Sequence, residues 1–114
     1  MPPRLIPRLR VVDDDTVILG PGKADLLEAV ARLGTLREAA AEMGMSYMRA
    51  WKLVGVMNEA FCKPLIITTR GGTEGGHAEL TPAGHEALRL YRQIESESVA
   101  ATRESWKTLR KMLR

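Results

Sequence analysis

The apolar positions between residues 36 and 61 predict two helices separated by a short turn. Before the turn, apolar side chains recur at the spacing of one helical face, at Leu36, Ala39, Ala40 and Met43. Gly44 can adopt the left-handed conformation that ends a helix, and Ser46 is a good N-cap for the next one. The apolar face then returns at Ala50, Leu53, Val54, Met57 and Phe61. The stretch therefore predicts a helix-turn-helix.

The first turns of the second helix carry hydroxyl groups and cations on the side opposite its apolar face. These are the groups that reach phosphate oxygens and base edges in DNA. The candidate DNA-binding residues of this helix are Ser46, Tyr47, Met48, Arg49 and Lys52. A pair of packed helices in any small bundle is the alternative interpretation of the same spacing.

Two β-prone runs near the N-terminus predict an antiparallel hairpin ahead of the helix pair. Residues 9–12 and 16–19 are rich in Val, Ile and Leu, and three consecutive Asp residues separate them as a turn. A further helix is expected over residues 23–33, where Gly34 ends it. Three helices thus follow one another in quick succession.

A second hairpin is expected after the helix pair. Pro64 prevents the preceding helix from continuing, residues 65–69 are strongly β-prone, and residues 77–80 can return as their partner across a glycine-rich tip. A hairpin directly after a helix-turn-helix is the wing of a winged-helix domain. The candidate DNA-binding residues of this wing, residues 65–80, are Arg70, Thr73 and His77.

The C-terminal third predicts one long helix. Thr81 is a suitable N-cap, Pro82 fits the first helical position, and no Gly or Pro interrupts the chain between Gly84 and Arg114. Thirty residues of helix extend roughly 45 Å, which is more than a small domain covers. We therefore predict a dimerisation arm, with a frayed, solvated tail as the alternative. The residues assigned to the dimer interface are Leu88, Tyr91, Ile94, Val99, Trp106 and Leu109.

Together these elements predict a mainly α protein with a small β content. Residues 8–80 would form a winged helix-turn-helix domain with an N-terminal β-hairpin, and residues 81–114 the long dimerisation helix. The length of 114 residues suits one domain with an appendage, and only 4% of residues are aromatic, so aliphatic side chains must fill the core. The formal net charge of +3 is compatible with a polyanionic partner.

Several classes of protein are disfavoured by what the chain contains. A single cysteine, Cys62, cannot form an intramolecular disulfide, and His77 and His85 lack the spacing of metal ligands. We therefore expect no catalytic site, metal or cofactor, and no enzyme activity. The chain has no apolar run of about 18 residues and no apolar signal core, so we expect a cytoplasmic protein without a membrane partner.

Four motifs resemble a known family. They are Gly20-Pro21-Gly22-Lys23, the Ser46-Tyr47-x-Arg49-Ala50-Trp51 run, the glycine-rich wing from Gly71 to Gly76, and Leu80-Thr81-Pro82-Ala83-Gly84. Over about residues 8 to 95 the chain resembles the DNA-binding N-terminal domain of ModE-type molybdate-responsive transcription regulators, and more distantly the LysR-type winged helix. The resemblance implies a dimer that binds operator DNA through the winged helix. Members of that family carry C-terminal molybdate-binding domains that this chain does not include, so we carry over DNA binding but not molybdate binding.

Two hypotheses about function follow. In the first, the chain is a sequence-specific transcriptional regulator that binds double-stranded DNA as a homodimer at an inverted-repeat operator. Recognition helix 46–61 would then lie in the major groove, with the wing on the flanking backbone or minor groove. In the second, the winged helix is a protein-interaction module that docks on a separate effector-sensing protein. Arg49 and Lys52 favour DNA, whereas Met48 and Trp51 would also suit a protein groove.

Overall fold

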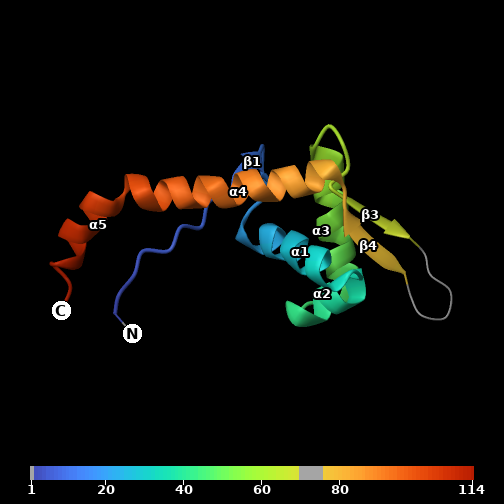
Figure 1. Ribbon diagram of the computed structural model, residues 1–114, viewed down its shortest axis with the longest axis horizontal. Helices are drawn as coiled ribbons and strands as arrows, with labels where there is room; N and C mark the ends of the chain where they lie inside the picture. Colours follow the sequence, from blue (N-terminus) through green and yellow to red (C-terminus); the bar gives the residue numbers. More distant parts are fainter. Residues whose placement is uncertain (1, 70–75) are drawn as a thin grey trace.

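A computed structural model describes residues 2–69 and 76–114 of the chain. Three helices and a wing form a body from which the C-terminal helices extend (Figure 1). The elements are β1 (Val11–Asp13), β2 (Thr16–Leu19), α1 (Pro21–Leu33), α2 (Leu36–Glu42), α3 (Tyr47–Ala60), β3 (Ile66–Thr69), β4 (His77–Leu80), α4 (Pro82–Ala101) and α5 (Arg103–Arg110). The predicted mainly α winged helix-turn-helix fold is confirmed.

The two turns that separate the helices of the body have the expected chemistry. Gly44 has a φ of +68°, the left-handed region that costs glycine little, and the chain then enters α3. The Ser46 hydroxyl accepts a hydrogen bond from the Arg49 amide at 3.1 Å, and the Thr35 hydroxyl accepts one from the Glu38 amide at 3.1 Å. Both hydroxyls satisfy amides that a helix start would otherwise leave unpaired. Local sequence thus sets where α2 and α3 begin.

The N-terminal hairpin forms with a small shift in its bounds. Its strands pair antiparallel, but β1 begins at Val11 rather than Leu9 and includes Asp13. Asp14 lies in the turn with a φ of +53°, a conformation that Asp tolerates better than most residues. The hairpin leads into α1 at the buried Gly20.

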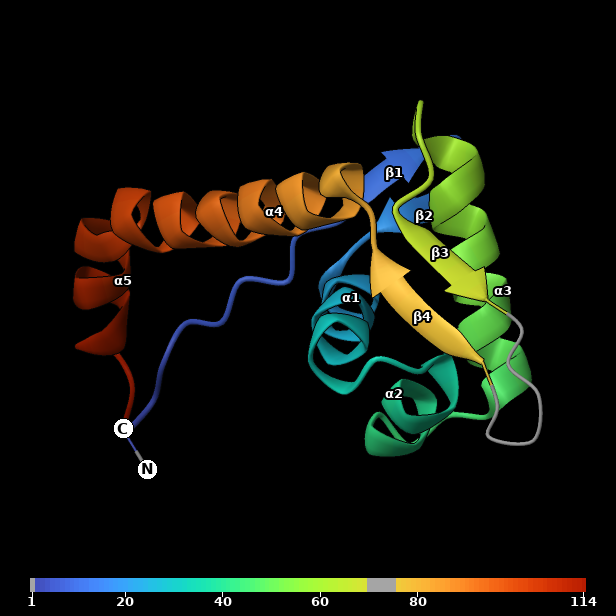
Figure 2. The same cartoon turned by 45° about the vertical axis from the view of Figure 1, so that its right-hand side comes forward.

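The core is almost entirely aliphatic, as the low aromatic content predicts. It lies between α1, α2, α3 and the wing strands, and α4 packs onto its edge (Figure 2). Its largest fully buried side chains are Tyr91, Leu26, Leu27, Met57, Leu65, Val30 and Val54. Burying each large aliphatic side chain contributes about 1.5–3 kcal/mol. The interior therefore fixes how α3 and the wing stand relative to each other.

One side chain of α3 ties the wing to the helix. Asn58 Oδ1 accepts hydrogen bonds from the amides of Leu65, at 2.8 Å, and Ile66, at 3.2 Å. Its Nδ2 donates to the Ile66 carbonyl at 3.0 Å. The wing strands pair from Ile66 with Leu80 to Thr69 with His77. The position of β3 is thus set by hydrogen bonds from α3 as well as by packing.

The start of α4 passes very close to the chain that leads into the wing. The Thr81 amide donates to the Leu65 carbonyl at 2.9 Å, and the Thr81 hydroxyl accepts from the Gly84 amide at 2.9 Å. A β-carbon at Gly84 would lie 2.1 Å from the Leu65 carbonyl oxygen, which is far inside van der Waals contact. Residue 84 must therefore be glycine for α4 to start here.

The prediction of one unbroken helix to the C-terminus is wrong. Helix α4 ends at Ala101, and α5 turns away from its axis after Thr102 (Figure 2). The hydroxyls of Ser98 and Thr102 donate to carbonyls one turn back, those of Ile94 at 2.8 Å and Ser98 at 2.7 Å. Such back-bonding by Ser and Thr weakens and bends helices, which the absence of Gly and Pro did not reveal.

Two residues assigned to the dimer interface pack against the core of the body. Tyr91 is 2% exposed, and its hydroxyl donates to the Leu9 carbonyl at 2.7 Å. Leu88 is half-buried and packs against the same core. The first half of α4 is therefore part of the packed body, and the predicted division at residue 80 does not coincide with an end of packing.

An ion-pair cluster also fixes α4 to α1. The Arg92 guanidinium contacts Asp25 at 2.8 Å and Glu28 at 3.1 Å, both on α1, and Glu95 at 3.0 Å on its own helix. Burial lowers the pKa of Arg92, but hydrogen bonds to the three carboxylates outweigh it and raise the pKa. Because the carboxylates of Asp25 and Glu28 are largely exposed, each pair contributes little by itself.

Candidate nucleic-acid interface

The first half of α3 presents an exposed face with cations, aromatic rings and no carboxylate. Its exposed large apolar side chains are Tyr47, Met48 and Trp51, and Arg49 and Lys52 are exposed between them. The first acidic residue of α3 is Glu59, in its last turn. All five predicted residues from 46 to 52 are exposed to solvent. The face is therefore electropositive and can donate hydrogen bonds to phosphates and base edges.

Ser46 has a structural task on this face. Its hydroxyl oxygen is the acceptor that caps α3, which leaves its proton free to donate outward. The cap also fixes where α3 begins, and the partial positive charge at that helix N-terminus favours an anion. Ser46 therefore positions Tyr47 and Arg49 in addition to any contact of its own.

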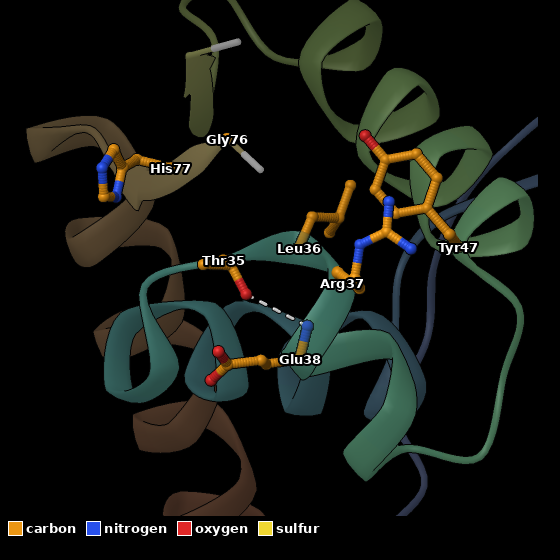
Figure 3. Close-up of a pocket in the computed structure, with 7 residues that line it drawn as sticks. All are labelled: Thr35, Leu36, Arg37, Glu38, Tyr47, Gly76 and His77. Carbon is orange, nitrogen blue, oxygen red and sulfur yellow. Dashed lines mark hydrogen bonds between the residues drawn. The ribbon is translucent and has the colours of Figure 1, made fainter. Parts of the chain in front are cut away.

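A small hollow lies between the N-termini of α2 and α3 and the base of the wing. It has a volume of about 110 Å³ and is lined by Thr35, Leu36, Arg37, Glu38, Tyr47, Gly76 and His77 (Figure 3). The Arg37 guanidinium carbon lies 5.3 Å from the centre of the Tyr47 ring, within range of a cation–π interaction. Arg37 thus restrains Tyr47 and adds a cation beside the start of α3.

Arg37 was missed by the sequence analysis because it lies on α2, ten residues before Tyr47. Helical periodicity relates residues three or four positions apart, so it gives no signal for a contact between two crossing helices. The exposed face of α2 would have been the place to search, because both helices of a helix-turn-helix approach DNA.

The structure describes only part of the predicted wing surface. His77 is exposed at the first position of β4, on the opposite side of the small hollow from Tyr47 (Figure 3). Arg70 and Thr73 lie outside the described residues. Of the wing candidates, His77 alone therefore has an assigned position.

The predicted dimerisation residues fall into different environments along α4 and α5. Ile94, Val99 and Leu109 are exposed and Trp106 is partly exposed, whereas Leu88 and Tyr91 face the body. Leu113, at the end of the predicted helix, is also exposed, as are Leu90 and Met112, which the prediction did not single out. Spacing identified apolar positions correctly but not which of them the body covers.

None of the helices in the described part of the chain has the length and apolar character of a membrane span.

Comparison with known families assigns the chain to a class. Residues 23–85, more than half of the chain, match the model of the "Bacterial regulatory helix-turn-helix protein, lysR family". The chain belongs to this family. The matched range begins inside α1, includes α2, α3 and the wing, and ends in the first turn of α4. It therefore covers the helix-turn-helix and its wing but not the N-terminal hairpin.

Curated relatives agree with the resemblance to ModE-type regulators. The molybdenum-pterin-binding protein MopA of Rhodobacter capsulatus is 42% identical over 77 residues, which are 68% of this chain and 29% of MopA. The molybdenum transport protein ModE of Azotobacter vinelandii is 33% identical over 98 residues, 86% of this chain and 36% of that protein. The DNA-binding transcriptional dual regulator ModE of Escherichia coli K12 is 34% identical over 71 residues, 62% and 27% respectively. The chain spans about a third of the length of these relatives.

A solved structure with a related fold is that of the CbnR DNA-binding domain in complex with DNA. It superposes with a TM-score of 0.58 at 22% sequence identity, covering 76% of this chain and 94% of that one. At this identity the likeness concerns the fold alone. It confirms the winged helix-turn-helix architecture of the body.

Proposed function

We propose that this member of the LysR family is a cytoplasmic regulator that binds double-stranded DNA in a sequence-specific manner as a homodimer. The observation that carries the proposal is that the first half of α3, the second helix of the helix-turn-helix, is exposed and has no acidic residue. In this class of domain the second helix enters the major groove with its N-terminal residues against the base edges.

Each exposed side chain of α3 has a role in this arrangement. Arg49 has a guanidinium that can make two hydrogen bonds to a guanine, and Lys52, one turn on, can reach a base edge or a phosphate. Tyr47 and Met48, at the helix start, contact the groove wall or a thymine methyl group. Wing residues Arg70, Thr73 and His77 would lie along the neighbouring backbone or minor groove, where Arg is attracted by the negative potential.

A second copy of the chain would cover the exposed apolar side of the C-terminal helices. Leu90 and Ile94 lie one turn apart on α4, and each leaves close to half of its surface in water. Val99 lines a largely apolar hollow with Leu5 and Ile6 of the N-terminal segment. Pairing through this side removes several large apolar side chains from water, and each contributes about 1 kcal/mol if half of it is newly buried. A two-fold dimer then predicts an operator with inverted repeats.

A second candidate function rests on Met48 and Trp51, which are 59% and 48% exposed on the same face of α3. Large exposed apolar groups beside Arg are typical of protein–protein contacts. In that case the face would dock on a partner protein, and its cations would be peripheral. The two functions differ in what Arg49 does.

The test is a selection of binding sites from a pool of random DNA duplexes, followed by affinity measurements on the selected site. The wild-type chain should enrich an inverted repeat. Arg49→Ala should weaken binding by about 1–3 kcal/mol for each half-site and relax the preference at one position of each half-site. Arg110→Ala, which removes an exposed cation on α5, is the matched control and should leave the preference unchanged.

Failure would take a clear form. If the wild-type chain enriches no sequence, or if Arg49→Ala keeps both affinity and preference, α3 does not read DNA. Loss of a protein partner on substitution of Met48 and Trp51, with DNA binding unaffected, would favour the interaction module.

A further inference from the structure

A second, larger hollow lies where the N-terminal segment, the start of α1 and the side of α3 meet. Its volume is about 440 Å³. Four cationic side chains line it: Arg8 and Arg10 from the N-terminal segment, Lys23 from α1, and Arg49 from α3. Its other lining residues are apolar, glycine or proline, and none is acidic. Three separate parts of the chain thus bring positive charge to one place.

Within residues 2–69 and 76–114, no carboxylate forms an ion pair with any of the four cations. In the described ranges 2–69 and 76–114, the arginines that form ion pairs are Arg32, Arg89 and Arg92, none of which lines this hollow. What distinguishes these four cations is that they line one hollow together and that none of its lining residues is acidic. Like charges placed together without compensation raise the local positive potential.

Lys23 is held in place for such a task. Its ammonium donates to the Val17 carbonyl at 2.6 Å, which fixes the side chain against β2 and leaves two of its three protons free. Burial and, second, the charge of Arg49 lower the pKa of Lys23. Both effects disfavour the charged form of Lys23. The negative charge of a bound anion would offset the repulsion between Lys23 and Arg49.

We infer that this hollow binds a phosphodiester of the DNA backbone beside the major groove that α3 enters. This inference rests on the proposed function, because Arg49 belongs to both surfaces and so places the hollow at the edge of the reading face. Arginine and lysine side chains supply most backbone contacts in protein–DNA complexes, and such contacts fix the register of the protein on the duplex.

The size of the hollow favours a backbone segment over a free ion. The hollow is open, has a volume of about 440 Å³, and receives cations from three separate parts of the chain. A single tetrahedral oxyanion would contact only part of such a wall, whereas a phosphate with its flanking sugars would extend across it.

Two of the four cations lie outside the part of the chain that matches the family. The family match begins at residue 23, so Arg8 and Arg10 belong to the segment before it. The Arg10 side chain passes beside Gly20, where a β-carbon would be in van der Waals contact with Cγ of Arg10 at 3.4 Å. The N-terminal segment thus contributes a contact to the backbone that the matched helix-turn-helix and wing do not supply.

The test measures how DNA affinity depends on salt. The affinity for DNA falls as salt rises, so a plot of log K against log salt concentration has a negative slope. Each cation that contacts a phosphate adds about 0.9 to the magnitude of that slope. Because a dimer brings two copies of each cation to one duplex, Arg10→Gln and Lys23→Gln should each reduce the magnitude of the slope by about two units, and the double variant by about four. They should weaken selected and random duplexes by the same factor. Lys63→Gln, an exposed cation at the far end of α3, is the matched control and should keep the wild-type slope.

Arg10→Gln guards against a folding artefact, because Arg10 is exposed and Lys23 also holds the Val17 carbonyl. If wild-type protein binds its selected site but both single variants keep the wild-type slope, the inference is wrong while the proposed function stands. If the wild-type protein binds no duplex, both fail.

A second arm separates the backbone from a free oxyanion. Calorimetry with inorganic phosphate and with molybdate should show no micromolar binding to the DNA-free protein. Micromolar binding of either ion that Lys23→Gln abolishes, together with an unchanged DNA slope, would assign the hollow to the free ion and overturn the inference.

Discussion

Replacing Asn58 by alanine should destabilise the protein more than any exposed substitution on α3. The side chain makes three hydrogen bonds to the backbone at the start of the wing, and Leu65 and Ile66 are both buried. Alanine would leave two amides and one carbonyl without these partners. An unsatisfied buried group costs about 1–3 kcal/mol.

The expected magnitude follows from this count and from the exposure of the site. Because Asn58 is only half-buried, water can reach part of the gap, and each group should cost near the lower limit. The sum is about 2–4 kcal/mol, a large share of the roughly 5–15 kcal/mol that stabilises an ordinary domain. Asn58→Asp keeps the acceptor for both amides and removes only the donor to the Ile66 carbonyl, so it should cost less than alanine.

Urea unfolding at one fixed protein concentration measures both free energies of unfolding. The fixed concentration is needed because a dimer would add stability by mass action. Glu59→Ala, at the adjacent exposed position, is the control and should change stability by less than about 0.5 kcal/mol. If Asn58→Ala lies within that range of wild type, the hydrogen bonds do not hold the wing in place.

Three further predictions concern α4. Gly84→Ala should lower the free energy of unfolding by at least about 2 kcal/mol in the same assay, because its β-carbon would collide with the Leu65 carbonyl; wild-type stability would contradict the close approach. Leu90→Glu combined with Ile94→Glu should give a folded monomer in sedimentation velocity, and a persistent dimer would exclude this side as the interface. Tyr91→Phe should stay dimeric yet lose about 1 kcal/mol of stability with its hydrogen bond to Leu9, whereas dissociation without that loss would return Tyr91 to the interface.

Features set by local chemistry could be predicted from the sequence. Gly44 and Ser46 define the turn of the helix-turn-helix, and Thr81 with Pro82 defines the start of α4, because caps and turn residues act within a few positions. The wing followed from a β-prone run after Pro64. These signals also indicated which face of α3 is exposed, since apolar spacing fixes which side is buried.

Features that depend on how elements approach each other could not be predicted. Leu88 and Tyr91 share apolar character with Ile94, and only the folded structure shows that Leu88 packs against the core and that Tyr91 is buried with its hydroxyl bonded to the Leu9 carbonyl. The break at Thr102 depends on hydroxyl bonds to carbonyls that many unbroken helices also contain. Composition and spacing therefore do not reveal which apolar residues of α4 are buried or where the C-terminal helix breaks.

The candidate site divides in the same way. The exposed residues of α3 are adjacent in sequence, so their common face was visible. The contact of Arg37 with Tyr47 joins two helices, and the hollow around Lys23 joins three segments, so neither has a sequence period. Sequence reasoning therefore found the proposed recognition helix but not the cations beside it.

Methylation interference on the selected duplex tests the central claim most directly. Methyl groups at guanine N7 lie in the major groove and those at adenine N3 lie in the minor groove, so the two report different grooves. If α3 of each protomer reads a half-site, N7 methylation should block binding in two symmetric patches one helical turn, or a multiple of it, apart. Arg49→Ala should remove the interference at one guanine in each patch. Interference confined to the minor groove, or a single unsymmetric patch, would contradict a dimer that reads DNA through α3.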